Sequence, residues 1–178
     1  MGPDHITLIS FGYPGKNMPE HILRDVEAEF RLPVIAKDGF LDIEEYFDQV
    51  RGQYNANKLL HRIEEQFSAD NEKVVAIFGI DLFIPILTYI FGQAFLNGKV
   101  AVTSTYRLGN ERYGLPKNDA IFIERFKKEV IHELGHTFGL IHCFDPVCVM
   151  RSSTYVEEID QKEHKFCQNC RNELLKAI

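Results

Sequence analysis

Three histidines in the last third of the chain have the spacing of a metal site. His132 and His136 are four residues apart, so on a helix their imidazoles share one face, one turn apart. His142 follows six residues later. Two imidazoles from adjacent turns and a third from the next segment are typical ligands of a catalytic zinc ion. Such a site keeps one open position, where a bound water has a pKa of about 7 and supplies hydroxide at neutral pH.

The helix must end soon after His136 if His142 is to reach the same metal. Gly139 lies midway between these two histidines, and glycine readily adopts the left-handed conformation that ends a helix and turns the chain. We therefore expect a helix that runs to about Phe138 and a sharp turn at Gly139. The turn would bring His142 to the metal from a different direction.

Glu133 directly follows the first histidine. A carboxylate at this position lies beside the metal-bound water and not on the metal, so it can accept a proton and deliver it to a leaving amine. The predicted reaction is attack of zinc-activated water on a carbonyl, with a peptide bond as the favoured substrate. The alternative is a surface helix that carries His and Glu by chance, but Gly139 and His142 at the required spacing argue against it.

Four cysteines form a second set of potential ligands. Four residues separate Cys143 from Cys148, and two residues separate Cys167 from Cys170. Two short-spaced pairs predict a closed tetrahedral zinc site with four thiolate ligands. Two disulfides, a redox-active Cys-x-x-Cys or an iron–sulfur cluster are the alternatives.

The two predicted metal sites meet at one point of the chain, because Cys143 directly follows His142. A zinc ion held by the cysteines would fix the irregular segment 142–166 to the C-terminal helix. It would also hold His142 in place and so support the catalytic site.

Alternating strands and helices must position these residues. We expect strands at residues 5–11, 32–36, 73–80, 89–95 and 100–106. Helices are expected at 20–31, in a mostly helical stretch at 42–67 that is either one rod or a loop and a helix, from an N-cap at Asp119 to about Phe138, and at 167–177. Loops or turns are expected at 12–19, 38–39 and 109–117, and Asn97-Gly98 predicts a hairpin turn. Segment 143–166 shows no strong periodicity.

Length and composition predict one compact domain. The chain has 178 residues, of which 45% are hydrophobic and 26% charged, as in ordinary globular proteins. A net charge of -6 argues against a nucleic-acid-binding protein.

The most hydrophobic stretch, 74–96, contains Asp81, Pro85 and Gln93 and fits buried strands better than a membrane helix. The first residues show no secretion signal, so we expect a cytoplasmic protein in which disulfides are not the default.

The motif His-Glu-x-x-His-x-x-Gly-x-x-His, followed by Met150, resembles that of the metzincin clan of zinc metallopeptidases. The cysteine after the third histidine, Cys148-x-Met150 and the later Cys-x-x-Cys are similar to the archaemetzincin family in particular. Shorter stretches at 53–56, 91–94 and 104–108 extend this resemblance over most of the chain.

The family resemblance implies an α/β (α+β) fold, with a twisted mixed sheet backed by helices, an active-site helix and a small zinc-stapled C-terminal part. Within a single catalytic domain, 1–178, residues 1–139 would form the upper part and 140–178 the part with the turn at Met150. Two zinc ions per chain are implied, one on His132, His136 and His142 and one on Cys143, Cys148, Cys167 and Cys170. Glu133 would be the general base.

The resemblance also implies details of the cleft. Strand 100–106 would form the sheet edge above it, where a peptide could bind by strand addition; alternatively, this strand is internal. Certain metzincins place a tyrosine two residues after the methionine, but this chain has Ser152 there. We expect the nearby Tyr155 either to reach the oxyanion or to line the pocket for the side chain after the scissile bond.

Taken together, these features predict a monomeric zinc metallopeptidase that acts on peptide or protein substrates, as an aminopeptidase or an endopeptidase. The competing hypothesis is a non-catalytic, zinc-stabilised peptide-binding module. We favour the enzyme because Glu133 beside an open three-histidine site has no structural purpose there.

Overall fold

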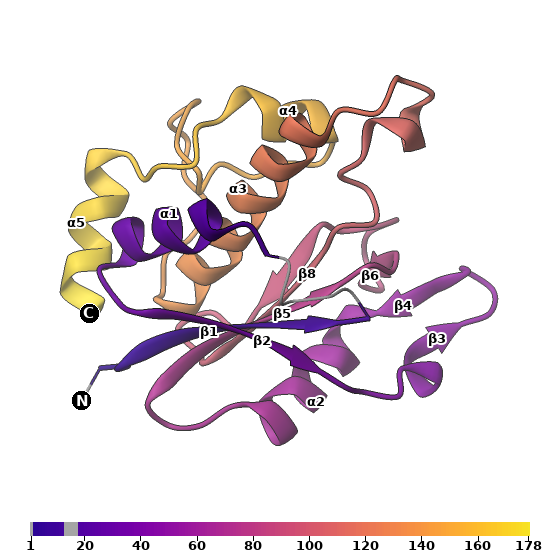
Figure 1. Cartoon of the computed structure of the whole chain (residues 1–178), viewed down its shortest axis with the longest axis horizontal. Helices are drawn as coiled ribbons and strands as arrows, with labels where there is room; N and C mark the ends of the chain where they lie inside the picture. Colours follow the sequence, from indigo (N-terminus) through magenta and orange to yellow (C-terminus); the bar gives the residue numbers. More distant parts are fainter. Residues whose placement is uncertain (1, 13–17) are drawn as a thin grey trace.

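A five-stranded mixed sheet runs through the molecule in the order β2-β1-β5-β8-β7 (Figure 1). The structure is a computed structural model and describes residues 2–12 and 18–178. The strands of this sheet are β1 (His5–Phe11), β2 (Val34–Gly39), β5 (Glu72–Phe78), β7 (Gly92–Ala94) and β8 (Val100–Ser104). A smaller sheet has the order β3 (Phe47–Asp48), β4 (Gln53–Asn55) and β6 (Leu82–Phe83).

The helices are α1 (Glu20–Phe30), α2 (Ala56–Phe67), α3 (Asp119–Thr137), α4 (Val156–Gln161) and α5 (Gln168–Ala177), with short 3₁₀ helices η2 (Glu44–Tyr46) and η3 (Asn110–Tyr113). Helices α1 and α3 cover one face of the large sheet, and α2 covers the other (Figure 1). The sheet therefore lies between two apolar cores, one under α1 and α3 and one under α2.

Parallel pairing dominates the large sheet. Strand β1 lies parallel to both β2 and β5, and β5 lies parallel to β8. Strands β1 and β5 are nearly continuous runs of buried residues, as expected for parallel strands covered on both faces. Within the described part of the chain, no helix is long and apolar enough to cross a membrane. The hydrophobic stretch 74–96 instead supplies most of β5 and all of β6 and β7, as its composition indicated.

The edge of the large sheet differs from the prediction. Strand β8 is internal, between β5 and β7, so the expectation that strand 100–106 forms the edge is wrong. The reason is the hairpin at Asn97-Gly98, which folds β7 antiparallel onto the outer side of β8. The hairpin itself was predicted correctly, and Asn97 has the positive φ of 55° that its turn requires. The edge strand on this side of the sheet is therefore β7, and β2 forms the opposite edge.

Other local predictions are partly confirmed. The expected turn at 38–39 is wrong, because Gly39 still pairs with Phe11 at the end of β2. Stretch 42–67 is not one rod: its second half forms α2, and its first half contains the short helix η2 and strands β3 and β4. Helix α4 lies within the aperiodic segment 143–166. The N-cap of α3 is Asn118 and not Asp119, because the Asn118 side chain accepts a hydrogen bond from the Ile121 N–H at 3.1 Å. Most of the predicted loop 12–19 lies outside the described residues.

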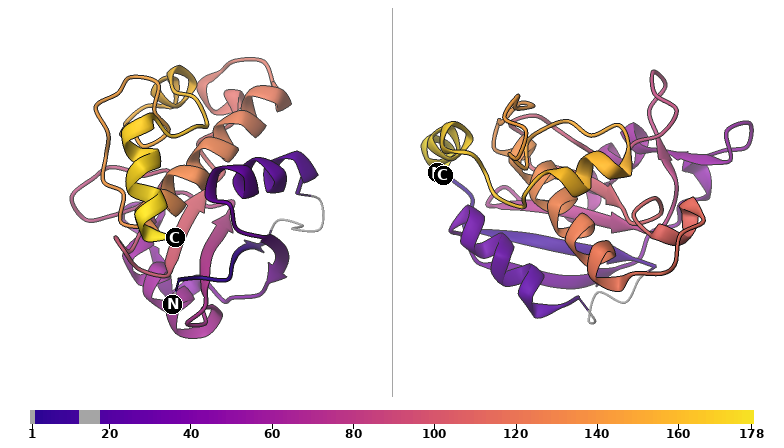
Figure 2. Two further views of the ribbon diagram at one scale, coloured as in Figure 1. Left: turned by 90° about the vertical axis from the view of Figure 1, so that its left-hand side faces the viewer. Right: turned by 90° about the horizontal axis from the view of Figure 1, so that it is seen from above.

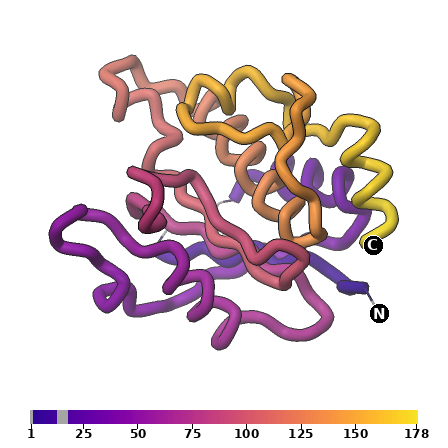
Figure 3. Tube along the Cα trace, turned by 180° about the vertical axis from the view of Figure 1, so that it is seen from behind, coloured from indigo at the N-terminus to yellow at the C-terminus, as the bar shows by residue number. Residues whose placement is uncertain are grey.

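The chain after α3 folds back over that helix (Figure 2). Buried basic side chains of α3 hold it there. The Arg125 guanidinium donates to both carboxylate oxygens of Asp160, at 2.8 and 2.7 Å, and Lys128 donates to the carbonyl of Ile159 at 3.0 Å. Viewed from behind, this C-terminal segment and α2 lie on opposite sides of the sheet (Figure 3). Helix α3 ends at Thr137 and is thus enclosed between the large sheet and the segment that follows it (Figure 2).

Candidate active site

The long helix α3 carries His132 and His136 through the interior of the molecule. Its second half is apolar around the histidines, and Val130, Ile131 and Leu134 are fully buried. The helix packs against β8, β7 and β5. Because it is fixed on several sides, the two imidazoles project from a rigid support, which is what a precise metal site needs.

The helix ends where the sequence predicted. Gly139 has a φ of 88°, and the Leu140 N–H donates to the carbonyl of Gly135 at 3.0 Å, so the chain turns sharply after Phe138. The side chain of Asn97, at the tip of the β7–β8 hairpin, lies close to Gly139. The left-handed glycine redirects the chain so that His142 returns toward the helix.

The three histidines converge. One ring nitrogen from each of His132, His136 and His142 lies within 4.8 Å of the others. The centroids of the three rings are 4.7, 5.0 and 5.3 Å apart. The structure thus brings together all three residues that were predicted to hold a catalytic metal.

The donor pattern of the imidazoles fits a cation. Nδ1 of His132 lies 2.8 Å from the carbonyl oxygen of Val149, and Nδ1 of His136 lies 2.7 Å from that of Leu140. Carbonyl oxygens only accept hydrogen bonds, so each Nδ1 carries the proton and each Nε2 presents a lone pair. The two Nε2 atoms are only 3.2 Å apart, and two lone pairs at this distance repel unless both bind a cation. The group therefore fits a divalent metal such as zinc.

Burial also favours the metal-binding form of the rings. It lowers the pKa of His136 and His142 below the ordinary value and lowers the pKa of His132 most strongly. The charge of Lys162 acts in the same direction on all three. Neutral imidazoles are therefore the stable form at neutral pH, and neutral imidazole is the form that ligates zinc.

Glu133 lies in the same cleft as the histidines and is only 5% exposed. Burial raises the pKa of Glu133 well above its ordinary value; nearby Glu129 adds to this, and Lys162 opposes it. A Cβ atom added to Gly92 of β7 would lie 2.5 Å from Oε1 of Glu133. The edge strand therefore approaches the carboxylate as closely as a glycine allows, which restricts the position of the carboxylate.

Met150 packs against α3 at the level of the histidines. It is fully buried, and its sulfur lies against Gly135, where any side chain would collide with it. The Cys143 N–H donates to the carbonyl of Met150 at 2.9 Å, which ties this turn to the residue after His142. The methionine thus packs against the helix between the two histidines.

The histidines and Glu133 line a cleft of about 730 Å³. The edge strand β7 and the segment before it form one wall, residues 152–155 form the other, and α3 forms the floor. Tyr155 lines this cleft and is 62% exposed. Large apolar side chains surround the histidines on the walls and rim: Ile84, Leu87, Tyr89, Phe91, Leu96 and Ile141. A second cavity of about 820 Å³, between α1 and the start of α3, contains no predicted site residue among the described residues that line it.

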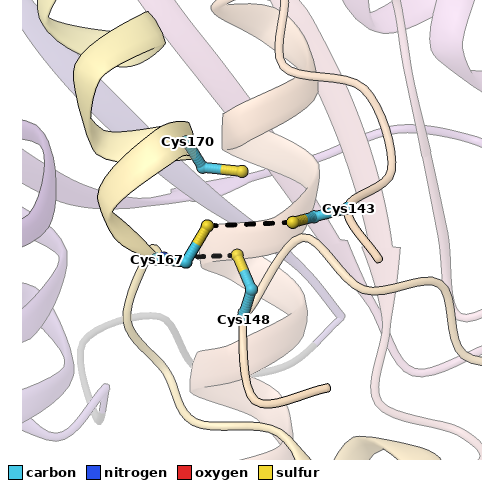
Figure 4. A group of neighbouring side chains, drawn as sticks. All are labelled: Cys143, Cys148, Cys167 and Cys170. Atoms are coloured by element: carbon cyan, nitrogen blue, oxygen red, sulfur yellow. Dashed lines mark hydrogen bonds between the residues drawn. The ribbon is translucent and has the colours of Figure 1, made fainter. Parts of the chain in front are cut away.

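The four cysteines also converge (Figure 4). Their sulfur atoms all lie within 4.8 Å of one another, and all four thiols are free. Sγ of Cys143 lies 3.7 Å from Sγ of Cys167, too far for a disulfide bond. Two backbone N–H groups donate to sulfur, from Cys167 to Cys148 and from Asp145 to Cys143. Four sulfur donors in one cluster fit zinc, and an iron–sulfur cluster uses the same ligand type.

Burial raises the pKa of two thiols of this cluster. The pKa of Cys148 rises to about 11, and that of Cys170 rises further. These two thiols therefore hold their protons at neutral pH until a metal ion displaces them. The cluster fits a metal that binds thiolate strongly.

Some residues of the cleft were not predicted from the sequence. Gly92 belongs to the stretch 91–94 that supported the family resemblance, but no local pattern showed that it meets Glu133. Glu129 precedes Glu133 by four residues, so their shared helix face was a usable signal. Lys162 lies in the aperiodic segment and gave no signal.

The comparisons with known proteins agree with this geometry. The sequence model of Peptidase family M54 matches residues 22–176. An archaemetzincin from Haloquadratum walsbyi is 44% identical over 132 residues, which covers 72% of this chain and 75% of that protein.

Solved structures support the fold. The crystal structure of an archaemetzincin from Methanopyrus kandleri has a TM-score of 0.81 at 34% identity and covers 98% of this chain and 96% of its own. The crystal structure of a zinc-dependent peptidase from Methanocorpusculum labreanum has a TM-score of 0.80 at 31% identity, with 95% and 99% covered. The predicted mixed α/β fold is therefore confirmed.

Proposed function

The chain belongs to peptidase family M54, the archaemetzincins, and we propose that it hydrolyses peptide bonds with Glu133 as the general base. The observation that carries this proposal is the position of Glu133. Its buried carboxylate lies in the same cleft as three converging histidines and directly against the edge strand. A purely structural metal site needs no such carboxylate, whereas hydrolysis of an amide needs a base close to the attacking water.

His132, His136 and His142 would hold the catalytic zinc. When bound, zinc acidifies a water molecule and polarises the substrate carbonyl. The hydrogen bonds from Nδ1 of His132 and His136 to backbone carbonyls fix both rings and direct their Nε2 atoms toward the site. The protein thus prepares the ligands before a substrate arrives.

Glu133 would accept the proton of the attacking water and deliver it to the amine nitrogen as the carbon–nitrogen bond breaks. Burial strengthens its affinity for a proton, which suits a group that must hold the proton between these two steps. Gly92 lets the edge strand approach the carboxylate, so the base and a strand-paired substrate would lie close together.

The substrate we propose is an extended peptide. Strand β7 is the last strand of the large sheet and lines the cleft, so one of its edges faces the site. A peptide could add to this edge through backbone hydrogen bonds. Large apolar side chains on both walls, including Leu87, Leu96 and Tyr155, favour apolar residues on either side of the scissile bond.

We propose that the four cysteines hold a second, structural zinc. Cys143 follows His142 directly, so this ion would fix the third histidine from the far side of the junction. The short distances among the four sulfur atoms and the absence of any disulfide among these four described cysteines support the assignment.

The wider proposal is a monomeric, cytoplasmic enzyme with one catalytic domain, in which residues 1–139 form the upper part and 140–178 the C-terminal part. Buried residues from both parts, such as Leu134 and Val149, share one core, which supports a single domain. Four free thiols suit a reducing compartment. The net negative charge argues against nucleic acid as a partner.

The test is cleavage of a mixed peptide library, with zinc content measured in the same sample. We expect chelator-sensitive cleavage that is absent in Glu133→Ala, and peptides with free and blocked N-termini distinguish an aminopeptidase from an endopeptidase. Peptide binding without cleavage across a broad library would instead support the alternative function, a zinc-stabilised binding module. Full activity of Glu133→Ala would refute the assignment of the general base.

A further inference from the structure

Three consecutive backbone carbonyls of the turn at Met150 each accept a hydrogen bond from a different part of the active site. The carbonyl of Val149 meets Nδ1 of His132 at 2.8 Å, and that of Met150 meets the Cys143 N–H at 2.9 Å. The third carbonyl, that of Arg151, accepts from the ammonium of Lys162 at 3.1 Å. The turn is thus attached to the active-site helix, to the chain after His142, and to a lysine.

Lys162 is an unusual residue in this position, because its side chain is only 1% exposed. Its charge partner is the carboxylate of Glu129, which is also buried and lies 3.3 Å away. Oε1 of Glu129 makes no hydrogen bond with the described residues. The ammonium of Lys162 is therefore the group that balances the negative charge of Glu129. Both residues line the cleft that contains the histidines.

The pair connects the same two elements as His132 does. Glu129 precedes His132 by three residues on α3, so the two side chains are neighbours on the helix surface. His132 contacts the first residue of the turn, Val149, directly. Glu129 is linked to the last residue, Arg151, through Lys162. The turn is therefore held against one helical segment at both of its ends.

We propose that Lys162 is a positioning residue of the three-histidine site: paired with Glu129, it fixes the turn 149–151 and thereby the imidazole of His132. This role rests on the proposed function of that site. Partners that orient a ligating histidine commonly contribute 10- to 100-fold, in order of magnitude, to metal affinity or activity. Lys162 acts one step further out, through the carbonyl that orients the ring.

Lys128 provides a matched control. It is a second buried lysine at the same helix, and it also donates to a backbone carbonyl, that of Ile159, at 3.0 Å. That contact holds α4 and not the turn at Met150. Lys128→Met therefore removes a buried lysine and its bond to a backbone carbonyl without touching the proposed attachment.

The experiment compares four variants: Lys162→Met, Glu129→Gln, the double variant and Lys128→Met. For each variant it measures zinc release from the three-histidine site in competition with a chelator, the thermal midpoint and kcat/KM. In Lys162→Met we expect zinc affinity to fall by roughly 10- to 100-fold, together with a lower midpoint, because Glu129 remains buried and unpaired. The double variant leaves no unpaired charge. Its midpoint should recover, but its zinc affinity should stay low. Lys128→Met should lose stability and keep its zinc affinity.

Recovery of zinc affinity in the double variant would overturn the proposal, because the pair would then contribute only to folding. An equal loss of affinity in Lys128→Met would overturn it as well. Zinc release is measured without any peptide, so a failure to cleave peptides would count against the proposed function and leave this comparison unchanged.

Discussion

The two candidate metal groups are joined at His142-Cys143, yet the protein builds them in opposite ways. The histidines lie on the floor of an open cleft, and backbone carbonyls orient two of their rings. Among the residues that the structure describes, none of the four cysteines lines that cleft. An open site with an adjacent base suits chemistry, and a closed sulfur cluster suits structure. Two residues adjacent in sequence, His142 and Cys143, thus belong to side-chain groups of different kinds.

The chain also supports the two groups in different ways. A long buried helix and the turn at Met150 hold His132 and His136 from several sides. Cys143 and Cys148, in contrast, lie on an irregular loop, and Cys167 lies just before the short helix α5. We therefore expect loss of the first metal to stop the reaction and loss of the second to weaken the fold.

The strongest test of the chemical side of this comparison is Glu133→Gln. The amide keeps the shape of the side chain but cannot accept a proton, so we expect kcat/KM to fall by about 10²- to 10⁴-fold. Zinc content should not change, because the three imidazoles and their carbonyl partners remain. Peptide cleavage and metal analysis on one sample check both statements. Loss of zinc in this variant would make Glu133 a ligand and contradict the proposed role.

Cys170→Ser tests the structural side. Removing one of four thiolates should release the second zinc and lower the free energy of unfolding by more than about 4 kcal/mol, as losses of a bound metal commonly do. Urea unfolding and zinc content measure the effect. We expect the zinc of the histidine site to be retained under conditions in which the variant is still folded. An unchanged midpoint after loss of one zinc would show that the fold does not need this site.

Local rules predicted which residues come together. Spacing grouped the three histidines and the four cysteines that converge in the structure, glycine chemistry predicted the helix end at Gly139, and Asn97-Gly98 predicted the hairpin turn. These features depend on a few residues that are adjacent in the chain. The strand and helix order followed from the hydrophobic pattern, and the α/β fold followed from that order and the family resemblance.

Features that depend on distant residues could not be predicted in this way. The order of β7 and β8 in the sheet depends on which side of β8 the hairpin folds, and no local pattern specifies this side. Lys162 and Glu129 are far apart in sequence, and neither lies in a motif. The meeting of Gly92 with Glu133 likewise joins two elements whose separation only the tertiary structure defines.

Gly92→Ala tests whether the edge strand restricts the base. The added Cβ would lie 2.5 Å from Oε1 of Glu133, so the carboxylate or the strand must move. Because a displacement of about 1 Å in an active site can cost up to 10²-fold in rate, we expect kcat to fall by roughly 10- to 100-fold. Gly79→Ala is the matched control, since its Cβ would meet only the Thr105 hydroxyl at 3.9 Å. Equal activity of the two variants would remove Gly92 from the site.

The smallest predicted effect is on the free energy of unfolding, which the buried Glu133 lowers. Burial raises the pKa of Glu133 well above 4.5, its usual value. As the pH rises above 4.5, the unfolded chain releases this proton and the folded chain retains it, so ionisation favours unfolding. The loss of stability continues until the pH reaches the folded pKa. Glu133→Gln cannot ionise, so it should be more stable than the parent at neutral pH, by a few degrees in thermal midpoint.

This gain in stability should depend on pH and on the metal. The difference in midpoint between variant and parent should be small at pH 5 and larger at pH 7.5, with a chelator that strips the three-histidine site and zinc content measured throughout. Bound zinc places positive charge beside the carboxylate and favours its ionised form, so zinc should reduce the difference. A pH-independent difference would mean that packing, and not ionisation of Glu133, sets the stability. In the cysteine cluster, by contrast, binding of a metal to the thiolates only stabilises the fold, so no stability is given up there for chemistry.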